Sequence, residues 1–110
     1  MLSSDIMRGY HDTMILSLLR EKDSYGYEIS KEIEQRSGGR YCIRETTLYS
    51  SFSRLEKAGY VTSYSGTESH GRRRIYYSIT DAGRAYFDEK CVERSELQQV
   101  MKSFIQEGLA

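Results

Sequence analysis

The chain has no proline, no tryptophan and only two cysteines among its 110 residues. Its longest apolar run is Met14–Leu16, whereas a membrane span needs about 20 apolar residues. Cys42 and Cys91 lie far apart, with no further cysteine or histidine at ligand spacing, which excludes a disulfide scaffold and a CxxC zinc site. Residues 1–5 lack the basic and apolar regions of a secretory signal. We therefore expect one small cytoplasmic domain without a metal, a cofactor or a membrane partner.

The chain has no excess of either charge, because 16 basic residues balance 16 acidic ones. The charges are nevertheless unevenly distributed: residues 40–78 carry 7 basic and 3 acidic side chains, and both flanking segments are acidic. The same middle segment holds six of the ten tyrosines. A phosphate-binding surface needs local rather than global positive charge, so the neutral total does not exclude a nucleic-acid partner.

Glycine alone separates the segments of secondary structure that the sequence predicts. Apolar residues at three- and four-residue steps predict helices over residues 5–21, 24–37, 45–58 and 80–106. Alternation predicts a brief strand at 40–43 and a hairpin of strands 60–64 and 74–79 with a long tip at 66–71. We expect Asp23 or Ser24, and Thr80 or Asp81, to cap two of the helices. Gly38-Gly39 and Gly59 are expected to end two helices.

This order is that of a winged helix-turn-helix with one extra helix at each end. The predicted fold is mainly α, with a two-stranded β-wing. We expect residues 1–79 to form the winged helix and residues 80–110 a long C-terminal helix, in one compact unit. The second half of the first helix is apolar on most sides. It therefore lies either at the centre of its own domain or under a second subunit.

The third predicted helix, residues 45–59, has one apolar and one polar face. Leu48, Phe52 and Leu55 share the apolar face. The opposite face is hydroxyl-rich and basic, and it carries Thr46, Tyr49, Ser50, Ser53, Arg54 and Lys57. Short polar side chains allow close approach to a DNA major groove, and longer basic ones reach phosphates. The alternative is an ordinary solvated face, but a purely structural helix has no need of so many serines.

The segment 66–74 is predicted to be the wing. Arg72, Arg73 and Arg74 are adjacent and repel one another unless an anionic partner is present. On a strand, Arg72 and Arg74 point to one face and Arg73 to the other, with Tyr76 following on the Arg74 side. These residues are candidates for contact with the phosphate backbone. The alternative is a charged strand edge that discourages aggregation.

No constellation of catalytic residues is present. His11 and His70 have no nucleophile beside them in the sequence, and we expect both at the surface. Cys42 and Cys91 are expected to be small core residues, although a thiol redox switch on the same fold is an alternative. The prediction is that the protein is not an enzyme.

Several stretches together resemble the PadR family of winged-helix transcriptional regulators, in its short subfamily with one C-terminal helix. The matching stretches are 15–19, 25–29, Thr47-Leu48-Tyr49, 54–61 and, above all, Gly71-Arg72-Arg73-Arg74-Ile75-Tyr76-Tyr77-Ser78-Ile79-Thr80-Asp81-Ala82-Gly83. The resemblance implies a homodimeric DNA-binding regulator, usually a repressor, that reads an inverted repeat. It also implies that the helix with Thr47 enters the major groove and that the wing follows the backbone.

The resemblance further implies that the final helix packs on its counterpart and on the first helix of the partner. The side chains expected at this interface are Met7, Tyr10, Met14, Phe87, Cys91, Leu97, Met101 and Phe104. Relatives often respond to small aromatic or cationic lipophilic effectors, which some hold between aromatic side chains of the final helix. Here tryptophan is absent and the middle of that helix reads Glu93-Arg94-Ser95-Glu96, so we expect a polar-lined pocket or none.

Two further features of the sequence allow alternative interpretations. Arg44, before the third helix, stands where relatives often have a capping Ser or Asn, and it could reach a phosphate instead. A winged helix that binds protein rather than DNA is an alternative function, and it would need an exposed apolar patch on the third helix.

Overall fold

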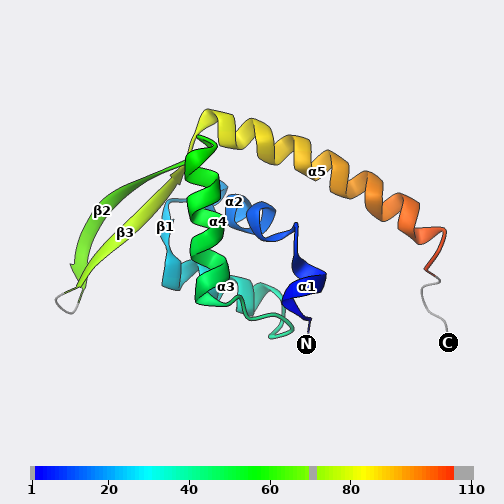
Figure 1. The fold of residues 1–110 in the computed structure, drawn as a ribbon, viewed down its shortest axis with the longest axis horizontal. Coiled ribbons are helices and arrows are strands. Elements are labelled where there is room, and N and C mark those ends of the chain that lie inside the picture. Colours follow the sequence, from blue (N-terminus) through cyan, green and yellow to red (C-terminus); the bar gives the residue numbers. More distant parts are fainter. Residues whose placement is uncertain (1, 70–71, 106–110) are drawn as a thin grey trace.

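A computed structural model describes the backbone of residues 2–69 and 72–105, and their side chains except those of 67–69 and 72. The elements are α1 (Ser4–Met7), α2 (His11–Glu21), β1 (Ser24–Tyr25), α3 (Gly26–Arg36), α4 (Glu45–Lys57), β2 (Val61–Ser69), β3 (Arg72–Ile79) and α5 (Asp81–Lys102). The strands form one antiparallel sheet in the order β1-β3-β2 (Figure 1). The chain is thus mainly helical, and its winged helix architecture confirms the fold predicted from the sequence.

The first predicted helix is wrong in one respect, because it is broken between α1 and α2. Gly9 adopts a φ of 90°, a left-handed conformation that a helix cannot contain and that favours glycine. The Tyr10 amide donates to the Met7 carbonyl across this turn, at 2.9 Å. The break lets α2 lie in the core, whereas α1 has no buried residue and contacts the core only through Met7.

The start of α3 also differs from the prediction. Neither Asp23 nor Ser24 caps the helix, since its N-cap is Tyr25 in an extended conformation without a side-chain cap. Ser24 and Tyr25 instead form β1, in register with Tyr77 and Tyr76 of β3. The strand expected at residues 40–43 is absent, because residues 41–44 have no regular secondary structure, although Tyr41 and Ile43 are buried as their alternation suggested.

The hairpin is longer than predicted. Strand β2 continues to Ser69 and β3 begins at Arg72, so residues 66–69 of the expected loop belong to β2, and residues 70 and 71 lie outside the described part. The register shifts between Ser65 and Glu68. Gly66 lies at this irregularity directly against the Tyr76 ring, where an added Cβ would lie 2.1 Å from ring carbons. A side chain at position 66 would therefore displace Tyr76.

The hydrophobic core lies between α2, α3, α4 and the inner face of the hairpin. Helix α4 contributes Leu48, Phe52 and Leu55, all of them buried, as their spacing predicted. The Phe52 ring stacks on Tyr77 of β3, with ring centroids 3.9 Å apart. Burial of each large apolar side chain stabilises the fold by about 1.5–3 kcal/mol. This packing fixes the orientation of α4 and leaves its opposite face outward.

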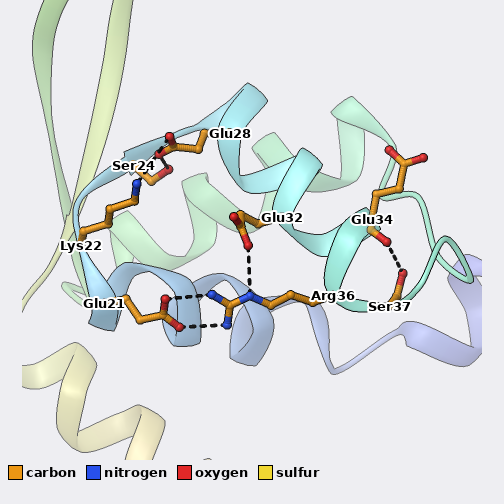
Figure 2. Close-up of polar contacts among 8 residues, drawn as sticks. All are labelled: Glu21, Lys22, Ser24, Glu28, Glu32, Glu34, Arg36 and Ser37. Atoms are coloured by element: carbon orange, nitrogen blue, oxygen red, sulfur yellow. Dashed lines mark hydrogen bonds and ion pairs between the residues drawn. The ribbon is translucent and has the colours of Figure 1, made fainter.

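A cluster of charged side chains joins α2 to α3. Arg36 on α3 donates two hydrogen bonds to Glu21 on α2, at 2.8 and 2.9 Å, and a third to Glu32 at 3.1 Å (Figure 2). Hydrogen bonding to Arg36 lowers the pKa of Glu21 below its usual range.

The end of α3 is followed by Gly38 and Gly39, which both have positive φ, as predicted for a helix stop.

Helix α5 begins at a side-chain cap and ends in an exposed segment. The Gly83 amide donates to the Thr80 hydroxyl at 3.0 Å, which confirms Thr80 as the predicted cap. The first half of α5 packs on α2, and the rest extends beyond the body of the protein (Figure 1). The radius of gyration is 15.5 Å, against about 13 Å for a compact chain of this length. The helix ends at Lys102 rather than near residue 106.

Candidate nucleic-acid interface

Helix α4 presents the polar face that the sequence predicted. Its N-cap is Arg44, which makes no side-chain capping hydrogen bond. Thr47 is half-buried, and the remaining predicted contact residues are exposed: Thr46, Tyr49, Ser50, Ser53, Arg54 and Lys57. Among these, Tyr49 is the only large hydrophobic side chain, so the described face of α4 has no apolar patch. Ser51 is fully buried, which its polar side chain did not predict.

Arg54 is held by a carboxylate from another helix, which sequence reasoning missed. Its Nη2 and Nε donate to the two carboxylate oxygens of Asp12 on α2, at 2.7 and 3.1 Å. The Asp12 side chain is only 20% exposed. Hydrogen bonding to Asp12 raises the pKa of Arg54, so the guanidinium stays charged. This bidentate pair ties α4 to α2.

Tyr49 is placed by a close approach of α3 to α4. The Tyr49 ring packs edge-on against Phe52, with centroids 5.6 Å apart. At Gly26, the first residue of α3, an added Cβ would lie 2.6 Å from the Tyr49 hydroxyl oxygen. Gly26 therefore provides the space that Tyr49 occupies. The tripeptide Tyr25-Gly26-Tyr27 belongs to one of the stretches that resemble the family. Nothing in it indicates that Gly26 contacts Tyr49, which lies 23 positions further along the chain on α4.

The wing residues differ in their surroundings. Arg73 is exposed, whereas the Arg74 guanidinium lies over the Tyr25 ring at 4.3 Å from its centroid. Tyr76 lies between the rings of Tyr25 and Tyr64, at 5.3 and 5.7 Å. Arg74 and Tyr76 thus stabilise the outer face of the sheet. Arg72 opens β3, and its side chain is outside the described part.

Three predictions about single residues are wrong. His11 is buried, with 7% of its surface exposed, and its Nε2 is 2.6 Å from the Tyr41 hydroxyl. Burial lowers the pKa of His11. Cys42 and Cys91 are both exposed rather than core residues, and at Cys42 it is the two neighbours, Tyr41 and Ile43, that are buried. Desolvation and a hydrogen bond with Glu34 raise the pKa of Cys42, which disfavours a reactive thiolate. The second histidine, His70, lies outside the described residues.

The residues expected at a dimer interface lie in three different surroundings. Tyr10, Met14, Phe87 and Cys91 line an apolar groove of about 430 Å³ between α2, α3 and α5. Phe87 is also buried in the core of the chain, and Met7 and Met14 pack against that core. The other three are exposed along the far half of α5 and just beyond it: Leu97, Met101 and Phe104.

The described residues contain no cluster of three potential metal ligands, and no described helix is long and apolar enough to cross a membrane. An exposed polar helix, held by a helix-turn-helix scaffold beside a β-wing, is the architecture of a winged-helix DNA-binding regulator. The family model for the transcriptional regulator PadR-like family matches residues 15–89. The chain belongs to this family, whose members are transcriptional regulators rather than enzymes.

Solved structures agree with this assignment. A transcriptional regulator from Clostridium thermocellum is 53% identical, with a TM-score of 0.88 over 96% of this chain and 100% of that one. A PadR family regulator from Clostridium difficile is 36% identical, with a TM-score of 0.74 over 87% of this chain and 98% of that one. Bacillus subtilis PadR in complex with operator DNA shares the fold, with 22% identity and a TM-score of 0.68 over 78% of this chain and 48% of that one.

Proposed function

We propose that the protein is a homodimeric, cytoplasmic repressor that reads an inverted-repeat operator, with α4 in the major groove and the wing on the phosphate backbone. The observation that carries this proposal is the exposed, hydroxyl-rich and basic face of α4. Thr46 and Ser50 lie near the start of the helix, where their short side chains permit close contact with base edges. Lys57 lies near its end, within reach of phosphates.

The wing adds affinity rather than sequence preference. Arg73 is exposed on β3, and Arg72 precedes it as the first residue of the strand. Arginines in such a position neutralise phosphates and release counterions, so they steepen the dependence of binding on salt. Arg74 contributes less, because it is already packed on Tyr25.

The dimer is supported by the unpartnered apolar surface of α5. Leu97, Met101 and Phe104 recur at helical spacing and are exposed in the single chain. The groove between α2, α3 and α5 is apolar, so it could receive the apolar surface of α5 from a second copy of the chain. A two-fold dimer would present its two α4 helices to half-sites about 34–36 Å apart, one turn of duplex.

A protein-binding winged helix is less well supported, because its contact surface would be an apolar patch on α4 that the described residues lack. A thiol redox sensor is likewise disfavoured by the raised pKa of Cys42.

Fluorescence anisotropy with the protein's own upstream promoter DNA, against a scrambled duplex, tests the proposal. At about 50 and 200 mM salt we expect preference for the promoter and a steep loss of affinity with salt. Equal, weak binding to both duplexes with a shallow salt dependence would contradict it.

A further inference from the structure

A cleft of about 570 Å³ lies between the turn before α2, one side of α4 and the middle of α5. We call it the cationic cleft, because its lining includes the side chains of Arg8, Arg54, Lys90 and Arg94. Asp12 is the only carboxylate among the lining residues. The sequence suggested that a pocket beside this part of α5 would be polar-lined or absent, and the described residues form a polar one. The cleft is thus locally positive in a chain whose formal net charge is zero.

Three of the four cations pair with carboxylates, but only one of these pairs is firm. Arg54 makes the bidentate pair with Asp12 on α2. Lys90 lies 3.3 Å from Glu93 on the same helix, and Arg8 lies 2.8 Å from a carboxylate of α1, with both side chains of that second pair largely exposed. Ion pairs open to water are weak, so Lys90 and Arg8 can exchange these partners for another anion at little cost.

Arg94 pairs with no carboxylate among the described residues. Its Nη2 donates to the Gly9 carbonyl, and its guanidinium lies over the Tyr10 ring at 4.1 Å from the centroid. Its Nε–H is buried and has no hydrogen-bond partner. A charged donor that is removed from water without a partner is unfavourable, and an oxyanion satisfies such a donor best. The surplus positive charge of the cleft therefore resides chiefly on Arg94.

The cationic cleft flanks α4 on the side away from the wing. The hairpin of β2 and β3 lies on one side of α4, whereas α5 extends away on the other (Figure 1). Thr46, Ser50 and Arg54 belong both to the lining of the cleft and to the exposed face of α4. The cleft therefore borders the same surface that α4 is proposed to present to DNA.

The dimensions of a duplex place a backbone strand on each side of α4. A helix with its side chains is about 10–12 Å across and the major groove is about 12 Å wide, so both sugar-phosphate strands border a helix in the groove. The wing lies toward one of these strands. The other strand then runs over the cationic cleft, where Thr47 adds a hydroxyl group beside the cations. Hydroxyl and guanidinium groups are common contacts of DNA phosphates.

The cleft and the proposed dimer contact use different sides of α5. Tyr86, Lys90 and Arg94 recur at four-residue steps, so they share the side of the helix that lines the cleft. Phe87 and Cys91 line the apolar groove between α2, α3 and α5 instead. A second copy that occupies the apolar groove therefore leaves the cationic side of α5 available to DNA.

We propose that the cationic cleft binds a phosphate group of the DNA backbone, held by Lys90 and Arg94 of α5 together with Arg54 of α4. The C-terminal helix then takes part in DNA binding as well as in the proposed dimer. This inference rests on the proposed DNA-reading role of α4, to which it adds a second backbone contact opposite the wing. A phosphate carries no base identity, so the cleft adds affinity and salt dependence for every sequence alike.

The salt dependence of DNA binding by Lys90→Gln tests the inference. Anisotropy titrations use the full chain with the promoter duplex and the scrambled duplex. We expect binding to both duplexes to weaken by roughly threefold or more at about 100 mM salt, and the slope of log K against log salt to become shallower by about 0.9. Lys90→Arg should keep the wild-type slope. Arg84→Gln is the matched control, because Arg84 is exposed on the same helix and does not line the cleft. Equal slopes for Lys90→Gln and Arg84→Gln would overturn the inference.

Arg94→Gln tests the second contact from α5. We expect it to weaken binding to both duplexes at least as much as Lys90→Gln does. Because Arg94 also holds the turn at Gly9, thermal melts establish that each variant is folded. Lys90→Gln leaves the bond between Arg94 and Gly9 in place, so its salt slope decides the question even if Arg94→Gln is unstable.

Neutral linkages in the DNA show whether a phosphate occupies the cleft. A methylphosphonate replaces one phosphate at a time in the bound duplex, and each duplex is titrated with wild type and with Lys90→Gln. We expect one position in each half-site where the neutral linkage weakens binding by the wild type but not by Lys90→Gln. Losses that add at every position would show that Lys90 contacts no phosphate, and would refute the inference.

The same titrations distinguish failure of this inference from failure of the proposed function. Preference for the promoter duplex with an unchanged salt slope in Lys90→Gln leaves the proposed function standing and excludes only the cleft. If the wild type binds neither duplex, the proposed function is wrong and the phosphate site in the cleft is wrong with it.

Discussion

Replacing Asp12 by Asn should lower stability and strengthen DNA binding at the same time. Asp12 is largely buried and accepts two hydrogen bonds from Arg54, which is more than half exposed. Exposed ion pairs contribute about 0–1 kcal/mol, and bidentate, partly buried ones somewhat more. Asn retains the shape and one acceptor, so we expect a loss of about 1 kcal/mol. For a domain of this size that corresponds to a decrease in Tm of about 4–8 °C.

The same substitution releases Arg54 on the proposed DNA-contacting face of α4. One additional phosphate contact steepens the slope of log K against log salt by about 0.9. Asp88→Asn is the matched control, because it makes the same charge change and releases Arg20, which is not on α4. Anisotropy titrations at several salt concentrations measure the slopes, and calorimetry measures Tm. A salt slope for Asp12→Asn equal to that of Asp88→Asn would refute the role given to Arg54.

Three further predictions follow from particular contacts. Gly26→Ala should displace the Tyr49 hydroxyl and weaken operator binding by about 1–2 kcal/mol. If the displacement of Tyr49 is the cause, fluorescence anisotropy will show that Gly26→Ala weakens operator binding less in a Tyr49→Phe background. Because burial lowers the pKa of His11, its contribution to stability should be fully present above about pH 6.5 and decrease as pH falls below that value. Urea unfolding between pH 5 and 7.5 should show that the free energy of unfolding depends less steeply on pH in His11→Gln than in the wild type. An unchanged slope would contradict this prediction. Leu97→Glu should produce monomers in sedimentation experiments. Val92→Glu should not, because Val92 is exposed on another side of α5. Equal behaviour of the two variants would exclude the apolar surface with Leu97 from the interface.

Periodicity was sufficient to predict the helices that carry the proposed site. Leu48, Phe52 and Leu55 are one turn apart, and their burial leaves Thr46, Ser50 and Ser53 outward. Local signals of this kind depend only on residues close in the chain. The cap at Thr80 was predictable for the same reason.

Contacts between distant residues could not be predicted in this way. Asp12 and Arg54 are 42 positions apart, and His11 and Tyr41 are 30 apart. Nothing local in the sequence shows that His11 turns inward at the start of α2. The two-residue strand β1 is likewise too short for any alternation, and it exists because β3 offers an open edge to pair with.

Selection of bound duplexes from a random pool tests most directly whether α4 reads DNA sequence. Wild-type protein should enrich an inverted repeat with half-sites about one helical turn apart. Ser50→Ala should change the preferred base at a symmetric position in each half-site, whereas Arg72→Ala with Arg73→Ala should enrich the same motif with lower affinity. Absence of any enriched motif, or a motif that is unchanged by Ser50→Ala and altered by the wing variant, would contradict the assignment of α4 as the recognition helix.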